Sequence, residues 1–318
     1  MAKKIAVFLG DVARDEYYTV DEFPVVGDKV LTHQKESFYG GMVANAACVY
    51  AAYGGQVKFC FDLNPRDKDL CDELETRGID TKLVQYHGYL PDSKCLIFLS
   101  GDDDSTCFIV TMSDHNIVIT PEVVEAVKKA DILYSNPFEL KRMVVEGTDL
   151  TPHDVMKSWA EAGVKIMCDM DVDTVDDAYP QIVPFIDTVF MNDNGYDDLD
   201  KATGTGVQSI LDMGVKTVVV TLADKGVDIY TADSKIHVDA VPTDVVDVTG
   251  AGDTFCSSFV FANGILDDLT QAAIFATYAA SRSIMEMGAR GGSRPVAEVL
   301  EYMKSKGEDT TPFEALLQ

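Results

Sequence analysis

Asp247-Val248-Thr249-Gly250-Ala251-Gly252-Asp253 places two glycines directly before a long apolar helical pattern, which begins at Thr254. An extended run, residues 236–246, precedes these seven residues, so the sequence predicts a strand that leads into a helix through a glycine-rich turn. Glycine lets backbone N–H groups converge on one point, and a helix N-terminus adds unpaired N–H groups and partial positive charge. The stretch therefore predicts an anion site formed by Gly250, Ala251 and Gly252, suited to phosphate groups.

Asp253 is predicted to lie in the first turn of that helix, beside the anion site. A carboxylate in this position can act as the general base that activates an alcohol for attack on a phosphoryl group. A bare Gly-x-Gly-Asp string by itself favours the alternative, a tight turn followed by an aspartate that stabilises the helix dipole. The rest of the sequence must decide between the two interpretations.

Outward from this stretch, short apolar runs alternate with helical patterns along the whole chain. Buried strands that alternate with helices form βαβ units, so we expect a three-layer α/β/α fold with a mainly parallel central sheet. The predicted strands are residues 5–9, 57–61, 132–135, 164–169, 188–191 and 217–222, and the predicted helices are residues 42–53, 67–77, 121–129, 152–162 and 207–213.

Two segments interrupt this alternation. Residues 16–39 contain a long extended stretch, and residues 82–112 read as several short strands in a hairpin-like pattern. We expect these two segments to form a small β-sheet lid. The α/β body would then comprise residues 1–15, 40–81 and 113–318. The tail after about residue 306 is acidic, and we expect it to fray.

Composition excludes several classes of function. The 318 residues carry a formal net charge of −27, which repels nucleic acid; a nucleotide could bind only where metal ions, backbone amides or a few basic groups offset the charge. No apolar run approaches the roughly 18 residues that suggest a membrane span. The seven cysteines are scattered without a Cys-x-x-Cys pair and the five histidines are dispersed, so we expect reduced thiols, a cytoplasmic location and no zinc site.

Two signatures in this chain resemble those of the PfkB (ribokinase-like) carbohydrate kinases. Residues 247–253 are similar to Asp-Thr-x-Gly-Ala-Gly-Asp, with Val248 in place of the threonine. Residues 40–47, Gly-Gly-Met-Val-Ala-Asn-Ala-Ala, resemble the family's Gly-Gly-x-x-x-Asn-x-Ala. The resemblance spans the chain from Gly10 to about Arg294. It implies a ribokinase-like fold, Asp253 as the catalytic base, and an anion hole formed by the Gly250–Gly252 amides.

The resemblance also implies where the acceptor sugar is held. Asp15 is the first candidate for binding sugar hydroxyls, because a carboxylate can accept two hydrogen bonds, and Asp11 is the second. A solvated loop aspartate remains the alternative for Asp15. The implied substrate-binding residues are Asp11, Asp15, Gly40, Gly41, Asn45 and Asn136.

For the nucleotide, residues 221–226 (Thr-Leu-Ala-Asp-Lys-Gly) resemble the family's Thr-Leu-Gly-x-x-Gly loop, with Ala223 in place of the central glycine. An exposed lysine is the alternative for Lys225. The resemblance implies ATP and Mg²⁺ as cofactors, and a K⁺ site that some relatives have near Asp247, Thr249 and Gly288. The implied ATP-binding residues are Asn192, Thr221, Lys225, Gly226 and Gly252.

Two further departures from the family pattern bear on function. The family's Asn-x-x-Glu, which helps to organise Mg²⁺, ends in Gly195 here, so Asp193 or Asp197 would have to supply the charge. Met42 stands where several relatives that act on ribose or phosphosugars carry a lysine. The lid segments contain no cluster of Arg or Lys that would bind a second phosphate, which favours an unphosphorylated acceptor.

The sequence thus predicts an ATP-dependent carbohydrate kinase that phosphorylates a hydroxyl of a sugar or similar small molecule. A nucleoside kinase on the same fold and a non-catalytic sugar or nucleotide sensor are the alternatives. The family also suggests a homodimer formed through the lid. The acceptor, the phosphorylated position and the oligomeric state are left open by the sequence.

Overall fold

The computed structural model describes residues 4–100, 105–110, 115–170, 176 and 178–317. Its body is built on an eight-stranded sheet in which six neighbouring strands are parallel and two strands at one edge are antiparallel. The strands, in spatial order, are β16 (Lys235–Val238), β15 (Val227–Tyr230), β14 (Thr217–Thr221), β13 (Thr188–Asn192), β12 (Lys165–Asp169), β10 (Ile132–Ser135), β1 (Ile5–Leu9) and β4 (Gln56–Cys60).

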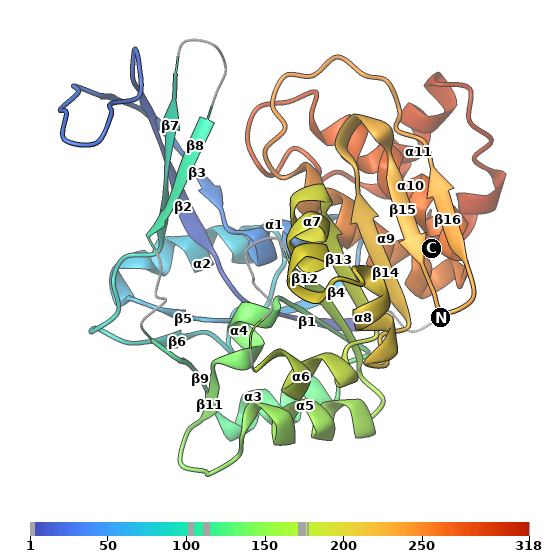
Figure 1. The fold of residues 1–318 in the computed structure, drawn as a ribbon, viewed down its shortest axis with the longest axis horizontal. Helices are drawn as coiled ribbons and strands as arrows, with labels where there is room; N and C mark the ends of the chain where they lie inside the picture. The colour runs from blue at the N-terminus through green and yellow to red at the C-terminus, as the bar shows by residue number, and fades with distance from the viewer. Residues whose placement is uncertain (1–3, 101–104, 111–114, 171–175, 177, 318) are drawn as a thin grey trace.

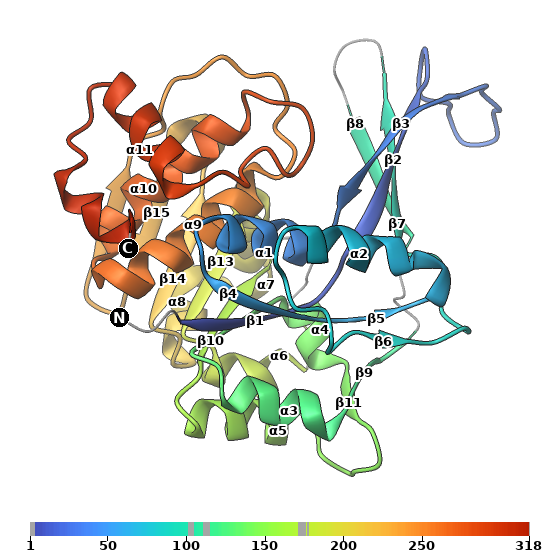
Figure 2. The same cartoon turned by 180° about the vertical axis from the view of Figure 1, so that it is seen from behind.

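Helices cover both faces of this sheet (Figures 1 and 2). On one face α1 packs on α9 and α9 packs on α10, while on the other α3 packs on α5 and α7 lies against β13. The first layer contains α1 (Met42–Ala52), α2 (Lys68–Thr76), α9 (Ala251–Leu266), α10 (Leu269–Ser283) and α11 (Val296–Ser305). The second contains α3 (Pro121–Lys128), α4 (Pro137–Lys141), α5 (Pro152–Glu161), α6 (Tyr179–Ile182), α7 (Asp193–Thr203) and α8 (Val207–Asp212).

This arrangement confirms the predicted three-layer α/β/α class with a mainly parallel sheet. The strands are buried on both faces, as in β1, where Ala6 to Leu9 have no exposed surface. Aromatic side chains fill the two interfaces; the ring of Phe8 lies 5.2 Å from that of Tyr134, and the ring of Phe190 lies 5.6 Å from that of Phe259.

A separate four-stranded sheet rises from one end of the body (Figure 1) and confirms the predicted small β lid. Its strand order is β3 (His33–Gly40), β2 (Ala13–Thr19), β7 (Lys94–Leu99) and β8 (Ser105–Val110). The boundaries drawn from the sequence put Asp15 and Gly40 in the body, whereas the structure places both in strands of this sheet. Two short parallel pairs lie nearby, β5 (Asp62–Leu63) with β6 (Gln85–Tyr86) and β9 (Ile117–Ile119) with β11 (Met143–Val145).

Two local predictions were wrong. The extended run ahead of the glycine-rich turn ends as a strand at Val238, and residues 239–250 have no regular secondary structure, because they must cross from the edge strand β16 to the start of α9. The C-terminal tail does not fray; it forms a 3₁₀ segment, η4 (Thr311–Leu317), and buries Phe313 against Phe275. Among the described residues, no helix is both long and apolar enough to cross a membrane.

Candidate active site

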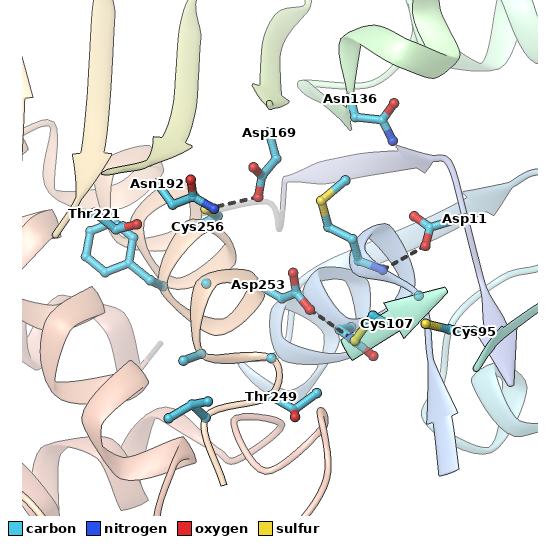
Figure 3. A pocket seen from close by; sticks show the side chains of 18 of the residues that line it. Asp11, Cys95, Cys107, Asn136, Asp169, Asn192, Thr221, Thr249, Asp253 and Cys256 are labelled. Atoms are coloured by element: carbon cyan, nitrogen blue, oxygen red, sulfur yellow. Dashed lines mark hydrogen bonds between the residues drawn. The ribbon is translucent and has the colours of Figure 1, made fainter. Parts of the chain in front are cut away.

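A cavity of about 1290 Å³ lies between the lid and the body, where parallel strands present their carboxyl ends (Figure 3). Such strand ends are where open α/β sheets bind ligands. Most of the residues singled out from the sequence meet here although they are far apart in the chain. They are Asp11, Asp15, Gly41, Asn45, Asn136, Asn192, Thr221, Gly226, Gly250, Ala251, Gly252 and Asp253.

The glycine-rich turn forms the N-terminus of α9. Gly250 is its N-cap with a left-handed φ of 76°, and a Cβ there would meet the carbonyl oxygen of Ala289 at 2.1 Å, so only glycine fits. The N–H of Ala251 donates to the carbonyl of Val248 at 3.2 Å. The N–H groups of Gly250 and Gly252 therefore remain as candidate donors to an anion. Around Gly252 there is open space, because a Cβ built there would meet no atom within 4 Å.

Asp253 lies in the first turn of α9 and lines the cavity. The Nδ2 of Asn45, from α1, donates to the Asp253 Oδ2 at 2.8 Å. The two signatures recognised in the sequence, about 200 residues apart, thus meet through one side-chain hydrogen bond.

Asp247 fixes the loop that carries the anion site. Its Oδ1 accepts a hydrogen bond from the Thr249 N–H at 2.9 Å, and its Oδ2 accepts one from the Gly288 N–H at 2.8 Å. The three residues considered for a monovalent cation are therefore joined directly. Both carboxylate oxygens of Asp247 already serve as backbone acceptors.

On the acceptor side, Asp11 and Asp15 behave differently. The Asp11 carboxylate accepts hydrogen bonds from the N–H groups of Met42 (2.9 Å) and Val43 (3.1 Å) and so caps α1, whose N-cap Gly41 has no side chain. Asp15 is only 6% exposed. Burial raises its pKa to about 7 and the charge of Asp11 adds to the rise, whereas Arg290 opposes it.

The carboxylate of Asp15 packs directly against the backbone of Gly40. A Cβ at Gly40 would lie 2.0 Å from the Oδ2 of Asp15, which is far inside van der Waals contact. The first glycine of the Gly40-Gly41 pair is thus required by a neighbouring carboxylate and not by its own backbone conformation.

Asn136 is buried at the end of β10, and its Oδ1 accepts a hydrogen bond from the Glu139 N–H at 2.8 Å, so it caps α4. This cap brings Glu139, which the sequence analysis did not identify, into the cavity lining. Burial raises the pKa of Glu139 to about 7; Asp11 adds to the rise and Arg142 opposes it. The sequence held one signal for Glu139, because it stands three residues after Asn136, which is the spacing between an N-cap residue and a glutamate in the first turn of a helix.

On the nucleotide side, the Oδ1 of Asn192 accepts a hydrogen bond from the Gly195 N–H at 2.8 Å and caps α7. Thr221 and Gly226 line the cavity, but Lys225 is exposed and is not among the described lining residues. Ala223, which replaces a family glycine, has a positive φ of 51°. This conformation costs a non-glycine residue roughly 1–2 kcal/mol.

The described lining of the cavity is strongly acidic. Lys94 and Arg142 are its basic side chains other than His115. A polyphosphate would enter such a field only with its own cations. The carboxylates are Asp11, Asp15, Asp62, Glu139, Asp169, Asp193, Asp224 and Asp253.

Two carboxylates lie where Mg²⁺ bound to a nucleotide could be held. Asp193 lines the cavity at the start of α7. Asp169 ends β12 and accepts hydrogen bonds from the Tyr134 hydroxyl (3.3 Å) and the Cys256 thiol (3.4 Å). Carboxylate oxygens are the hard donors that Mg²⁺ prefers. Within the described ranges, no group of three or more His, Cys, Asp or Glu side chains forms a metal cage.

Comparison with known proteins assigns the chain to a family. Residues 3–296 match the profile described as pfkB family carbohydrate kinase. The chain belongs to the pfkB family of carbohydrate kinases. Family membership confirms the enzyme class predicted from the sequence, an ATP-dependent carbohydrate kinase.

Individual relatives in this family are distant. Ribokinase of Staphylococcus aureus (strain COL) is 23% identical over 315 residues, which cover 94% of this chain and 99% of that protein. The structure of Arabidopsis thaliana ribokinase complexed with ribose and ATP superposes with a TM-score of 0.78 at 23% identity, covering 96% and 99% of the two chains. Burkholderia thailandensis nucleoside kinase in complex with inosine gives a TM-score of 0.77 at 17% identity, covering 96% and 97%.

Proposed function

We propose that this pfkB-family protein transfers the γ-phosphoryl group of ATP to a hydroxyl of an unphosphorylated sugar or sugar-like molecule, with Asp253 as the general base. The observation that carries the proposal is the Asp253 carboxylate, which lies in the first turn of α9 after Gly250 and Gly252 and lines a large cavity. A base and an anion site at the head of one helix suit phosphoryl transfer to an alcohol.

In the proposed reaction the acceptor lies between lid and sheet and donates hydroxyl hydrogen bonds to Asp15 and Glu139. Asp253 takes the proton of the reacting hydroxyl as its oxygen attacks the γ-phosphorus in line. The N–H groups of Gly250 and Gly252 stabilise the charge on the transferring group. The lid strands β7 and β8 line the acceptor side of the cavity and would exclude water, which limits hydrolysis of ATP.

ATP would lie along the carboxyl ends of β13 and β14, near Asn192, Thr221 and Gly226. Mg²⁺, when bound with the nucleotide, would offset negative charge on its phosphates. Asp169 and Asp193 are the residues that would hold it, in place of the missing glutamate at position 195. The ATP found in the Arabidopsis neighbour supports a nucleotide in this fold.

Two features favour an unphosphorylated acceptor. The lid segments carry no cluster of Arg or Lys residues, and the acceptor end of the cavity is lined by Asp11, Asp15, Asp62 and Glu139. A second phosphate there would be repelled.

A nucleoside is the second candidate for the acceptor. The same cavity has an apolar wall of Ile97, Ile109 and Phe138, against which a base could pack while its ribose meets Asp15. The inosine bound to the Burkholderia neighbour supports this candidate.

The test is ADP release from Mg²⁺-ATP across a panel of sugars, cyclitols and nucleosides, with Asp253→Asn as the paired variant. We expect at least one acceptor to be phosphorylated. The asparagine variant should lose roughly 10²–10⁴-fold in kcat, the contribution typical of a general base, while its acceptor Kd changes little. A protein that binds panel members without any turnover would instead be a sensor, and Asp253→Asn with near wild-type kcat would refute the base assignment.

Three further expectations stay predictions. They are a cytoplasmic location, K⁺ activation near Asp247, and a homodimer formed through the lid. The loop between β2 and β3 exposes Val25, Val26 and Leu31. Measuring the molar mass by light scattering, for the wild type and for a variant with serine at these three positions, would test the dimer.

A further inference from the structure

Arg290 connects the loop after α10 to the catalytic base through Asn45. Its Nε donates to the Asn45 Oδ1 at 3.2 Å and its Nη2 donates to the Gly40 carbonyl at 3.2 Å, while its Nη1 pairs with Glu73 of α2. The Arg290 side chain is only 7% exposed. The guanidinium is therefore a buried, multiply bonded group directly behind Asn45.

These contacts fix which way the Asn45 amide faces. An asparagine amide has one acceptor oxygen and one donor nitrogen. Because Oδ1 takes the Arg290 hydrogen bond, Nδ2 faces Asp253 and donates to its Oδ2 at 2.8 Å. The flipped amide would set its oxygen against the Asp253 carboxylate and its NH₂ against the guanidinium. Both contacts would be repulsive, and both present hydrogen bonds are of the stronger charge-assisted kind.

We propose that Arg290 is a positioning residue for the phosphoryl transfer. By orienting the Asn45 amide, it keeps a hydrogen-bond donor on the Oδ2 of Asp253 and so fixes the orientation of that carboxylate in the cavity. This inference rests on the proposed function. It adds a group that belongs to neither recognised signature.

If Arg290 only held the lid to α2, its loss should act like the loss of Arg14, which makes a similar contact but has a side chain that is 33% exposed, against 7% for Arg290. Arg14 also pairs with a carboxylate of α2, Asp69, and its guanidinium lies 5.9 Å from the Tyr39 ring centroid, against 5.8 Å for Arg290. No hydrogen bond or ion pair found for Arg14 involves Asn45 or Asp253 in the described part of the chain. Arg14→Gln therefore removes a lid-to-α2 contact without touching the amide.

The kinetic experiment compares Arg290→Gln with Arg14→Gln. We expect Arg290→Gln to lower kcat roughly 10–100-fold, as expected when a reacting group loses its orientation, with the KM for ATP within about threefold of wild type. Arg14→Gln should keep kcat within about threefold. Among the described residues, Arg290→Gln leaves Glu73 paired only with Arg77, so the double variant Glu73→Gln/Arg290→Gln is measured beside Glu73→Gln to separate the lost ion pair from the lost contact with Asn45. The double variant should show the kcat loss of Arg290→Gln, and Glu73→Gln alone should not.

A second readout does not depend on turnover. The chain has seven asparagines, so a protein labelled with ¹⁵N-asparagine gives seven side-chain amide pairs, and the Asn45 pair is the one lost in Asn45→Ser. Asp253→Asn adds an eighth side-chain amide pair, which is assigned as the new one. We expect this substitution to shift the Asn45 amide resonances in the wild-type background and to leave them unchanged in the Arg290→Gln and Glu73→Gln/Arg290→Gln backgrounds. Equal shifts in all backgrounds, or an unchanged kcat in both Arg290 variants, would overturn the inference. If no acceptor is phosphorylated, the proposed function fails while the amide experiment still decides the role of Arg290.

Discussion

Replacing Gly40 by alanine should displace the side chain of Asp15, which we propose binds the acceptor, without changing Asp15 itself. The new Cβ would lie 2.0 Å from Oδ2, 2.4 Å from Cγ and 2.5 Å from Oδ1 of Asp15, so the buried carboxylate must move away. A hydrogen bond to a charged group contributes about 1.5–3 kcal/mol, which corresponds to roughly 10–150-fold in binding. We expect kcat/KM for the acceptor to fall by that factor, with the KM for ATP nearly unchanged.

The assay is coupled ADP release with varied acceptor, and a double-mutant cycle makes it specific. In an Asp15→Ala background the carboxylate that clashes is gone, so Gly40→Ala should then cost less than about threefold. Gly88→Ala is the control, because a Cβ at Gly88 meets nothing within 4 Å. An equal loss in both backgrounds, or a Gly40→Ala enzyme with wild-type acceptor kinetics, would refute the reasoning that Gly40 serves Asp15.

Three other results are expected. First, acceptor binding near pH 7 should release protons. Burial raises the pKa of Asp15 and of Glu139 to about 7, and acceptor hydroxyls that donate hydrogen bonds to these carboxylates favour the ionised forms. Titration calorimetry in two buffers of different ionisation enthalpy measures the number of protons released. Second, the free energy of unfolding of the ligand-free protein should fall from pH 5 to pH 8. Between the unfolded pKa values of Asp15 and Glu139 near 4 and their folded values near 7, the folded state binds more protons than the unfolded state. Urea unfolding should show a smaller fall in the free energy of unfolding for Asp15→Asn/Glu139→Gln. Third, Gly195→Glu should lower the Mg²⁺ concentration needed for half-maximal activity. Its Cβ would meet the Cβ of the buried Met191 at 3.3 Å, so Met191 must shift by a few tenths of an ångström to admit it. A higher Mg²⁺ requirement in a folded variant would contradict a metal role for this position.

The sequence was sufficient for the architecture and for the residues that carry a motif. Strands 5–9 and 132–135 were predicted with the bounds that the structure gives, because parallel strands buried on both faces are short continuous apolar runs. Asp253 and Asn45 were found for a different reason. Each is placed by local chain geometry, a helix start after glycines, which a sequence pattern records directly.

The residues that the sequence analysis missed are placed by tertiary contacts. Arg290 contacts Asn45 only because the loop after α10 folds back onto α1, and Asp169 enters the cavity only because β12 lies between β10 and β13. No local pattern records such neighbours. The ATP-binding role of Lys225 stays a prediction, because its side chain is exposed and lies outside the described lining of the cavity.

Ala223 and Gly195 are departures from the family pattern that raise the question of a sensor, and the buried charges argue for a catalyst. Burial of Asp15 and Glu139 destabilises the ligand-free protein at pH values where the two carboxyl groups are ionised. Hydroxyls of a bound ligand can offset this destabilisation in a sensor as well as in a kinase. Asp253 differs, because it faces the glycines of a helix N-terminus and is held by Asn45. A protein that only binds sugar gains nothing from an anion site beside an oriented base, whereas phosphoryl transfer requires both in one place.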